Sequence, residues 1–293
     1  MTILEALNWG QEQLKQTAHE KRESCEPMGD SQLLLAACLS KPTAFLFSHF
    51  EDPLSQTIIE KYQRFIARRK RHEPIAYILQ TAHFYGRPFH VNPFVLIPRP
   101  ETESIIDLAK EILQDTSTII DVGTGSGAIA VTLAAEFNQP VIAIDIDPQA
   151  LSVAKRNADR ANVGHLLSFM HGDLLEPLAM SGIRETNQPH TLITANLPYL
   201  TQTQFKLTDP DVQTYEPKHA LVGGLDGLEH YDRLFAQLAM MRDRLTKTVD
   251  IIIEIDPSQS NPLAQIIRSH FPEANAEIIV DLTKKDRFVH VSI

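Results

Sequence analysis

Short apolar segments typical of strands alternate with helix-like segments from about residue 117 to residue 255. The strand-like runs are 118–121, 141–145, 167–170, 191–195 and 250–255. Helical periodicity fills two of the intervals, at 128–137 and 148–162. This alternation predicts a doubly wound α/β fold on a parallel sheet, because each crossover returns a helix to a face of the sheet. Ligands of such sheets bind at the carboxyl ends of the strands, so the residues that follow each strand are the candidate site.

A glycine-rich loop, Asp121-Val-Gly-Thr-Gly-Ser-Gly127, follows the first of these strands. The spacing Gly123-x-Gly125-x-x-Ala128 also satisfies the loose dinucleotide pattern, so by itself it does not separate a dinucleotide from S-adenosylmethionine. Asp121 favours the second ligand. A carboxylate at the end of a strand suits a sulfonium or amino group and would repel a pyrophosphate.

Further acidic residues stand at the ends of the next two strands. Asp145, 18 residues past Gly127, is placed to accept hydrogen bonds from both ribose hydroxyls. Asp173 is a candidate partner of the adenine amine, with a helix N-cap as its alternative, whereas we interpret Asp147 as a turn carboxylate. The predicted cofactor-binding residues that follow from the strand ends are Asp121, Gly123, Thr124, Gly125, Gly127, Asp145, Asp173 and Asn196.

Asn196-Leu197-Pro198-Tyr199 follows the fourth strand-like run and forms the predicted catalytic loop. An amide or exocyclic amine nitrogen is a poor nucleophile, because its lone pair is delocalised. The Asn196 side-chain oxygen and the Leu197 carbonyl can accept its two N–H bonds and direct the lone pair at a methyl group. Tyr199 can stack on the planar group. The alternative is an ordinary Pro-Tyr turn that closes a strand; the neighbouring glycine loop favours methyl transfer to nitrogen.

The first eighty residues have the periodicity of helices. One apolar stripe contains Ile3, Leu4, Leu7 and Leu14, and a second runs over 33–39 after Asp30 as its candidate N-cap. Residues 44–50 and 55–69 are also amphipathic, and residues 83–95 have the pattern of a hairpin. We therefore predict three parts: a helical domain at 1–80, a β-hairpin linker at 81–96 and the methyltransferase domain at 97–293.

Charge is distributed unevenly along the 293 residues, whose net charge is -10. Residues 1–95 hold 11 Lys/Arg and 10 Asp/Glu (+1), and residues 96–293 hold 16 and 27 (-11). The acidic second part argues against a long non-specific grip on nucleic acid. A basic run remains, which is either a solvated helix end favoured by the helix dipole or a contact for an acidic protein or RNA. Its members are Arg64, Arg68, Arg69, Lys70, Arg71 and His72.

Cysteine and histidine usage indicates neither a disulfide framework nor a metal site. Cys25 and Cys38 lack metal-type spacing, so we expect reduced thiols, and the 12 histidines show no ligand spacing. Residues 1–10 do not resemble a signal peptide, and the apolar run 33–39 is too short to span a bilayer. A cytoplasmic location is expected.

Several further segments carry a resemblance to a known family over nearly the whole chain. They are 73–78 (Glu-Pro-Ile-Ala-Tyr-Ile), 97–103 (Ile-Pro-Arg-Pro-Glu-Thr-Glu), 215–217 (Tyr-Glu-Pro), 220–228 with Gly-Gly-x-Asp-Gly-Leu, and Asp281 with Asp286-Arg287. Together with the two loops, in this order, they resemble the protein-(glutamine-N5) methyltransferases that act on peptide chain release factors.

The resemblance implies a Rossmann-like class I methyltransferase sheet, S-adenosylmethionine as methyl donor, and the glutamine of a release factor Gly-Gly-Gln loop as acceptor. It implies that the helical domain helps to dock the release factor. By position, Asn196 and Tyr199 would hold the glutamine amide, and Glu101 would lie near the donor. The rim of the site would include Arg99, Glu216 and Pro217, with a structural salt bridge as the alternative for Arg99.

One departure from the family pattern keeps other functions open. Leu197 replaces a proline that is usual there, which keeps the carbonyl but costs about 0.5–1 kcal/mol of preorganisation. Asn-Leu-Pro-Tyr is also the form seen in adenine-N6 methyltransferases of ribosomal RNA, although these would be expected to carry a basic groove for a flipped base. A glutamine methyltransferase acting on a ribosomal protein is a closer alternative. An inactive scaffold would need a broken Asn196 or Asp121. We expect no stable nucleic-acid partner.

Overall fold

The computed structural model describes residues 1–15, 26–113, 117–180 and 189–293, and Cys25 lies outside these ranges. The chain forms two compact units. The first contains Met1–Thr81 together with Leu207–Glu216, and the second contains Ala82–Lys206 together with Pro217–Ile293. The division predicted from the sequence instead assigns residues 207–216 to the methyltransferase domain at 97–293.

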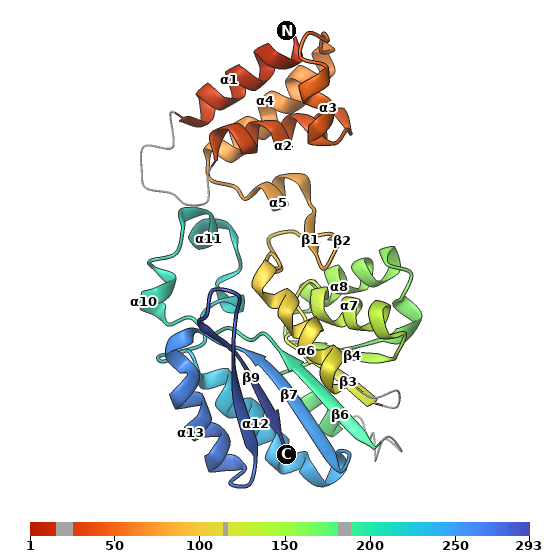
Figure 1. The fold of residues 1–293 in the computed structure, drawn as a ribbon, viewed down its shortest axis with the longest axis vertical. Helices are drawn as coiled ribbons and strands as arrows, with labels where there is room; N and C mark the ends of the chain where they lie inside the picture. Colours follow the sequence, from red (N-terminus) through yellow and green to blue (C-terminus); the bar gives the residue numbers. More distant parts are fainter. Residues whose placement is uncertain (16–25, 114–116, 181–188) are drawn as a thin grey trace. The chain divides into compact units, whose positions relative to one another are not determined.

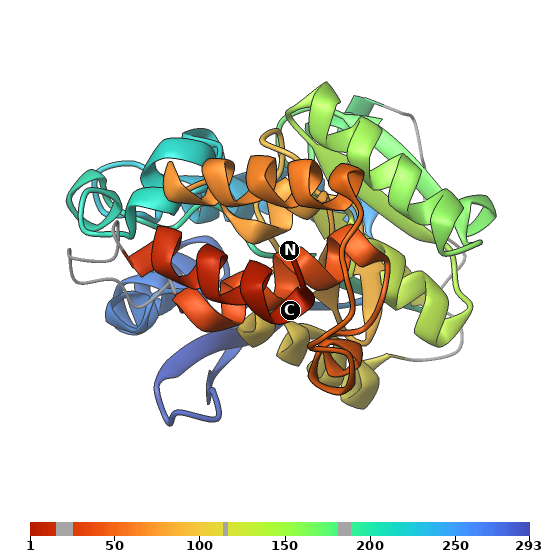
Figure 2. The ribbon, with the colours of Figure 1, turned by 90° about the horizontal axis from the view of Figure 1, so that it is seen from above.

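The first unit is helical, as the periodicity predicts. Its helices are α1 (Ile3–Lys15), α2 (Pro27–Leu39), α3 (Thr43–Ser48), α4 (Gln56–Lys70), α5 (Ile75–Leu79) and α11 (Pro210–Tyr215). Helices α1, α2 and α4 lie side by side (Figure 1, Figure 2). Leu7, Leu34 and Tyr62 are buried among them, and the Tyr62 hydroxyl lies 2.7 Å from that of Ser31. This hydrogen bond satisfies two polar groups inside an otherwise apolar core.

Asp30 has a different role from the one its sequence position suggests. Helix α2 begins at Pro27 with Glu26 as N-cap, so the prediction that Asp30 caps this helix is wrong. Asp30 is only 6% exposed, and its Oδ2 accepts a hydrogen bond of 2.7 Å from Nε of Arg69. Proline is favoured in the first helical turn, and a side chain one turn further on is free to point into the core.

The basic run at the end of α4 is largely engaged within the first unit. Arg69 is 5% exposed, and its Nη1 donates to Oδ2 of Asp211 at 2.9 Å. Arg68 forms an ion pair with Glu73, and Nζ of Lys70 donates to Gln13. Arg69 therefore belongs neither to a solvated helix end nor to an exposed binding patch. It joins α2, α4 and α11 through two buried carboxylates.

The second unit contains a hairpin and a large sheet. Strands β1 (Ala82–Phe84) and β2 (Arg87–Phe89) pair antiparallel. In the described part of the chain the seven-stranded sheet has the order β5-β4-β3-β6-β7-β9-β8. Its strands are β3 (Ser117–Val122), β4 (Val141–Asp145), β5 (Leu167–His171), β6 (His190–Ala195), β7 (Thr248–Glu254), β8 (Asn275–Val280) and β9 (Asp286–Ser292).

The doubly wound fold is confirmed, but the sheet is mixed. Strands β3 to β7 are parallel, as predicted, whereas β9 pairs antiparallel with β7 and with β8. The two final strands are consecutive and joined by a short turn. A connection of that length allows only an antiparallel pair, because a parallel pair needs a crossover of a dozen or more residues.

Helices cover both faces of the sheet (Figure 1). One layer consists of α6 (Ser104–Ile112), α7 (Ala128–Phe137) and α8 (Pro148–Arg160), and the other of α9 (Glu176–Met180), α12 (Glu229–Met241) and α13 (Ser260–His270). Successive strand residues alternate between the two cores: Ile119 packs with the first layer and Ile120 with the second. The short helix α10 (Gln202–Phe205) follows the predicted catalytic loop. No helix within the described ranges is long and apolar enough to cross a membrane.

A buried polar cluster lies at the edge of the sheet where β3 and β6 begin. His190 lies 2.7 Å from the Ser117 hydroxyl and 2.8 Å from Oδ2 of Asp250. Oδ1 of Asp250 faces His290 at 2.7 Å and accepts from Ser292 at 2.6 Å. Although burial opposes ionisation, the hydrogen bonds from both histidines and Ser292 lower the pKa of Asp250 below its ordinary value. The cluster ties β3, β6, β7 and β9 together far from the strand ends that carry the predicted site.

Arg69→Ala should destabilise the first unit strongly, because it leaves the buried carboxylates of Asp30 and Asp211 without their cation. We expect a loss of about 3–5 kcal/mol. The measurement is urea unfolding followed by the fluorescence of Trp9, the chain's single tryptophan, which lies in α1. Arg64→Ala is the matched control on the exposed face of α4 and should change stability by less than about 0.5 kcal/mol. Equal midpoints for the two variants would contradict a stabilising role for the Arg69 ion pairs.

Candidate active site

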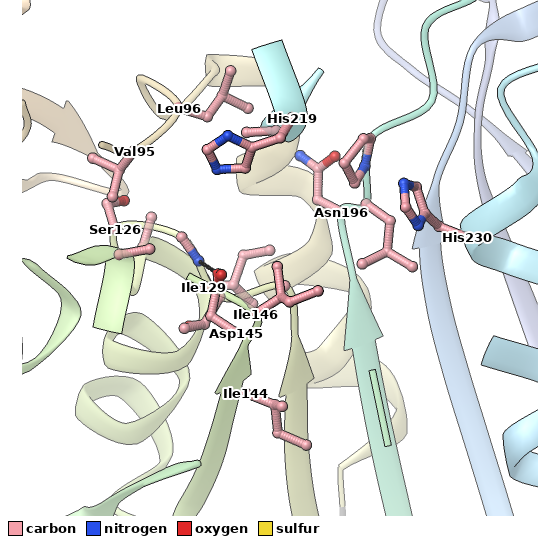
Figure 3. A pocket seen from close by; sticks show the side chains of 18 of the residues that line it. Val95, Leu96, Ser126, Ile129, Ile144, Asp145, Ile146, Asn196, His219 and His230 are labelled. Atoms are coloured by element: carbon pink, nitrogen blue, oxygen red, sulfur yellow. Dashed lines mark hydrogen bonds between the residues drawn. The ribbon is translucent and has the colours of Figure 1, made fainter. Parts of the chain in front are cut away.

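A cavity opens at the carboxyl edge of the parallel strands (Figure 3). The glycine loop after β3, the end of β4 and the loop after β6 line it, together with residues from the segment 94–102. Asp145 and Asn196 stand on its walls, and His219 and His230 lie near Asn196 in Figure 3. The cavity lies where the doubly wound topology predicts a ligand.

The structure brings most of the predicted residues to this cavity. Those that line it are Arg99, Gly123, Thr124, Gly125, Asp145, Asp173, Asn196, Leu197 and Pro198. Those that are not among its lining residues are Glu101, Asp121, Gly127, Tyr199, Glu216 and Pro217. The members of the second group have different surroundings.

Asp121 lies inside the sheet. It is 1% exposed, and its Oδ1 accepts a hydrogen bond of 2.8 Å from the Thr194 hydroxyl on the neighbouring strand. Burial raises the pKa of Asp121 to about 6. In this arrangement the carboxylate supports the strand end from which the glycine loop starts, and direct contact with a ligand stays a prediction.

The other residues away from the cavity have packing or surface positions. Gly127 is the N-cap of α7, where an added Cβ would lie 3.0 Å from Cβ of Ala154, so this glycine permits close approach of α8. Glu101 is exposed on a 3₁₀ turn, Pro100–Glu103. Glu216 is buried and belongs to the first unit, and Pro217 precedes the turn Lys218–Ala220.

Asp145 is held by backbone N–H groups at the end of β4. Its Oδ2 accepts from Gly125 at 2.7 Å, and its Oδ1 accepts from Asp147 at 2.9 Å. Burial raises its pKa, and these two hydrogen bonds oppose the rise. A carboxylate oxygen can accept more than one hydrogen bond, so both oxygens retain capacity for ligand hydroxyls. This geometry is compatible with a ribose acceptor, and contact of Asp145 with a ribose stays a prediction.

The two remaining acidic residues have distinct partners. Asp147 is the N-cap of α8, where its Oδ1 accepts from the Gln149 N–H at 2.8 Å, in agreement with a turn role. Asp173 forms an ion pair with Arg233, and both line the cavity. Helix α9 begins at Glu176, and both the N-cap alternative for Asp173 and its contact with an adenine amine stay predictions.

Asn196 is oriented by two side chains that sequence reasoning did not single out. Its Nδ2 donates to Oε2 of Glu254 at 2.9 Å and to the Thr102 hydroxyl at 3.1 Å. Glu254 is 1% exposed, and burial raises its pKa to about 7. One signal in the sequence could have found it: Glu254 is a lone carboxylate within the apolar run 251–255, at the end of the strand beside β6.

The loop that contains Asn196 is fixed by the Gly-Gly-x-Asp-Gly-Leu segment. Leu200 N–H donates to the Leu221 carbonyl at 2.9 Å, and Gly223 N–H donates to the Leu200 carbonyl at 2.9 Å. Nε2 of Gln259 donates to the carbonyls of Tyr199 at 2.8 Å and Asp226 at 3.1 Å. These contacts restrain the loop where the family's usual proline is missing.

Leu197 itself is packed beneath the glycine loop. The side chain is 3% exposed, and its Cδ2 would lie 2.8 Å from a Cβ at Gly123. Tyr231 places its hydroxyl 3.4 Å from the Leu197 carbonyl and 2.5 Å from the Glu254 carbonyl. Since one O–H donates most strongly to the nearer oxygen, the Leu197 carbonyl keeps acceptor capacity.

Tyr199 is not among the residues that line the cavity and packs against the core of the second unit. The side chain is partly buried, and burial raises its pKa, with the charges of Glu254 and Arg287 acting in opposite directions. His230, which does line the cavity, is kept towards its neutral form because burial lowers its pKa. Stacking of Tyr199 on a substrate group stays a prediction.

Comparison with curated proteins gives matches along the full chain. The chain is 33% identical over 299 residues to a release factor glutamine methyltransferase of Bacillus anthracis, with 100% of each chain covered. It is 34% identical over 297 residues to the protein of that description from Bacillus subtilis strain 168, covering 98% of this chain and 96% of the relative. Residues 5–79 match the PrmC N-terminal domain family, and residues 99–209 match the ribosomal protein L11 methyltransferase (PrmA) family.

Solved structures resemble the fold at low sequence identity. The catalytic domain of hMettl16, in complex with the MAT2A 3'UTR hairpin 6, superposes with a TM-score of 0.52 at 17% identity. The match covers 70% of this chain and 74% of that chain. At this identity the likeness supports the methyltransferase fold alone.

Gly227→Ala should destabilise the protein more than a matched glycine change elsewhere. Gly227 has φ of +78°, and an added Cβ would overlap the Tyr199 carbonyl and Nε2 of Gln259. Gly86 has φ of +71° with open space around it. Gly86→Ala should therefore cost only about 1–2 kcal/mol of backbone strain, and Gly227→Ala a further loss of about 1–3 kcal/mol from overpacking. Thermal unfolding measures both; equal losses would show that the loop yields to the added methyl group.

Asp121→Asn should change how stability depends on pH. The native pKa of Asp121, about 6, lies above the ordinary carboxyl value, so the native state binds this proton more tightly than the unfolded chain. Wild-type stability should fall as pH rises from about 4 through about 6 relative to the variant, since each tenfold difference in proton affinity between the two states corresponds to about 1.4 kcal/mol. Urea unfolding monitored by circular dichroism at pH 4.5 and 7.5 gives the comparison. A constant difference between the two proteins would refute the raised pKa.

Proposed function

The chain belongs to the family of release factor glutamine methyltransferases, and on that premise we propose that it methylates the side-chain amide nitrogen of a release factor glutamine with S-adenosylmethionine as donor. The observation that carries this proposal is one shared cavity whose walls include both Asp145 and Asn196. A donor site and an amide-binding loop that share one cavity can bring a methyl group to an amide nitrogen.

The residues around the glycine loop fit S-adenosylmethionine. When bound, this donor supplies an electrophilic methyl group on a sulfonium. Asp145 would accept from the ribose hydroxyls, and Gly123 and Gly125 let the backbone approach the ligand without a side chain between them. The exposed apolar side chains of Phe94 and Ile146 also line the cavity and offer contacts for the flat base.

Asn196 acts on the acceptor nitrogen by fixing its orientation. Oδ1 of Asn196 accepts one N–H of the glutamine amide, and the Leu197 carbonyl accepts the other. The nitrogen lone pair then points out of the plane of these two bonds, towards the donor. As the new N–C bond forms and the C–S bond of the sulfonium would break, positive charge develops on nitrogen and both hydrogen bonds strengthen, which lowers the barrier of this step without a general base. The methylated nitrogen would then release one of its N–H protons to water, which leaves the neutral N-methyl amide.

A protein amide, rather than a nucleobase, is the substrate that the chain supports best. Residues 96–293 carry a net charge of -11, whereas RNA binding draws on Lys and Arg contacts to phosphates. Docking of the release factor by the helical unit and a cytoplasmic location stay predictions. Because the net charge bears on nucleic-acid binding only indirectly, adenine methylation is included as an outcome of the test below.

The test is transfer of label from S-adenosylmethionine to matched acceptors. The purified protein is incubated with unmethylated release factor, with the same factor whose loop glutamine is changed to alanine, with ribosomal proteins and with unmodified ribosomal RNA. We expect label only in the factor with the intact glutamine. Label in ribosomal protein or in RNA would replace the proposed substrate by that acceptor.

Two substitutions separate acceptor binding from donor binding in this assay. Asn196→Ala removes the amide acceptor and should reduce kcat by about 10²–10³-fold, while the donor Kd stays within a few-fold. Asp145→Ala should instead weaken the donor Kd, since it removes both ribose contacts. Calorimetric titration with S-adenosylhomocysteine measures donor affinity. Near-normal rates for Asn196→Ala would be incompatible with the amide clamp.

A further inference from the structure

Three side chains from three elements meet at the predicted catalytic loop, and two of them, Thr102 and Asn196, also line the cavity. Asn196 follows β6, Glu254 ends β7, and Thr102 lies in the 3₁₀ turn Pro100–Glu103. The Thr102 hydroxyl donates to Oε2 of Glu254 at 2.7 Å, and Nδ2 of Asn196 donates to that oxygen at 2.9 Å. The parallel register pairs Ala195 with Ile253, so the two residues that follow, Asn196 and Glu254, are neighbours.

The donors and acceptors of this group allow one arrangement. Oε2 of Glu254 accepts the Thr102 proton, and in the ionised form of Glu254 both carboxylate oxygens only accept hydrogen bonds, so the side of Asn196 that faces this group must then be the NH₂ group. The Thr102 hydroxyl donates its only proton to Glu254 and accepts from Nδ2 of Asn196 at 3.1 Å. No hydrogen bond in the described part of the chain engages Oδ1 of Asn196. The oxygen of the amide is therefore the end left for a substrate.

Rotation of the Asn196 amide by 180° would reverse this arrangement. Oδ1 would then face the buried Oε2 of Glu254, and two acceptors in contact in a low-dielectric site repel each other. The NH₂ group would face the substrate, where it cannot accept an N–H. Glu254 is held in place next to Asn196, because Tyr231 donates to the backbone carbonyl of Glu254 and the Glu254 side chain is buried.

We propose that Glu254 and Thr102 are positioning residues, which fix the Asn196 side-chain amide with Oδ1 directed at the glutamine amide of the substrate. The proposal rests on the proposed function and adds two residues whose role is to orient Asn196 through their hydrogen bonds. Neither side chain supplies a proton or a nucleophile. Their removal lets the amide populate both orientations, so the loss falls on the rate of methyl transfer rather than on donor binding.

The kinetic test compares substitutions that remove or retain the acceptor. Glu254→Ala should lower kcat by roughly 10²-fold with a donor Kd within about threefold of wild type, because a misplaced amide cannot orient the nitrogen. Glu254→Gln keeps an oxygen for Nδ2 and should recover at least about tenfold of that loss. Thr102→Val should lower kcat by roughly tenfold, and Thr102→Ser, which restores the hydroxyl, should recover it.

Asp250→Asn is the control for general loss of stability. Asp250 lies on the same strand as Glu254 and is 8% exposed, but it belongs to the polar cluster at the other edge of the sheet. This variant should lower the thermal midpoint while kcat, measured well below that midpoint, stays within about twofold of wild type. If Asp250→Asn lowered kcat as much as Glu254→Ala, the effect of Glu254 would be structural and the proposal would fail.

A second readout does not depend on any substrate. The side-chain NH₂ protons of Asn196, assigned in an NMR spectrum by their loss in Asn196→Ala, should exchange slowly with solvent in wild type because Nδ2 donates to Glu254 and Thr102. They should exchange at least about tenfold faster in Glu254→Ala and Thr102→Val. Unchanged exchange in both variants would overturn the proposal. If wild type did not label a release factor, the proposed function would fail, and this measurement would still decide whether the orientation of Asn196 depends on Glu254.

Discussion

Parallel hydrogen bonding between β3 and its two neighbours, β4 and β6, determines where every other part of the site can lie. The ladder pairs Asp121 with Ala143 on one side and with Thr194 on the other. All three strands therefore end at one edge, where the glycine loop follows β3, Asp145 ends β4 and Asn196 follows β6. Strand β7 extends the ladder and adds Glu254. A shift of one residue in any pairing would turn these side chains to the opposite face.

Precision at the site comes from contacts made outside this ladder. The predicted catalytic loop is held by hydrogen bonds to the Gly223–Leu228 segment and to Gln259, both from a later part of the chain. The amide of Asn196 is held by Thr102 and Glu254. A proline at position 197 would restrain the loop through its ring. Here the hydrogen bonds from neighbouring segments restrain the loop instead, so Leu197 is compatible with a fixed loop. The site thus depends on hydrogen bonds among separate segments of the chain: the loop 196–199, the Gly223–Leu228 segment, Thr102, and Glu254 with Gln259.

The sequence allowed the main elements to be predicted because their patterns are local. Helix α7 begins and ends at the predicted residues, 128 and 137, and β4 matches its predicted range. Local patterns are insufficient to predict the role of a side chain whose partner lies far away in the sequence. Asp30 has the composition of a cap, but Arg69, 39 residues later, draws it into the core. The enclosure of Asp121 by Thr194 and the surrounding sheet likewise depends on a neighbouring strand that the residues around Asp121 do not reveal.

The sequence by itself determined the alternation of strands and helices, the glycine loop, the Asn-Leu-Pro-Tyr loop and the family motifs, since periodicity and turn residues act over a few positions. Only the tertiary structure decided which side chains meet: that residues 207–216 join the helical unit, that the last two strands turn antiparallel, and that Glu254 and Thr102 face Asn196. The physical reason is that hydrogen bonds and burial act through space. A lone carboxylate in an apolar strand indicates that a partner exists, but the pairing of strands determines which residue it is.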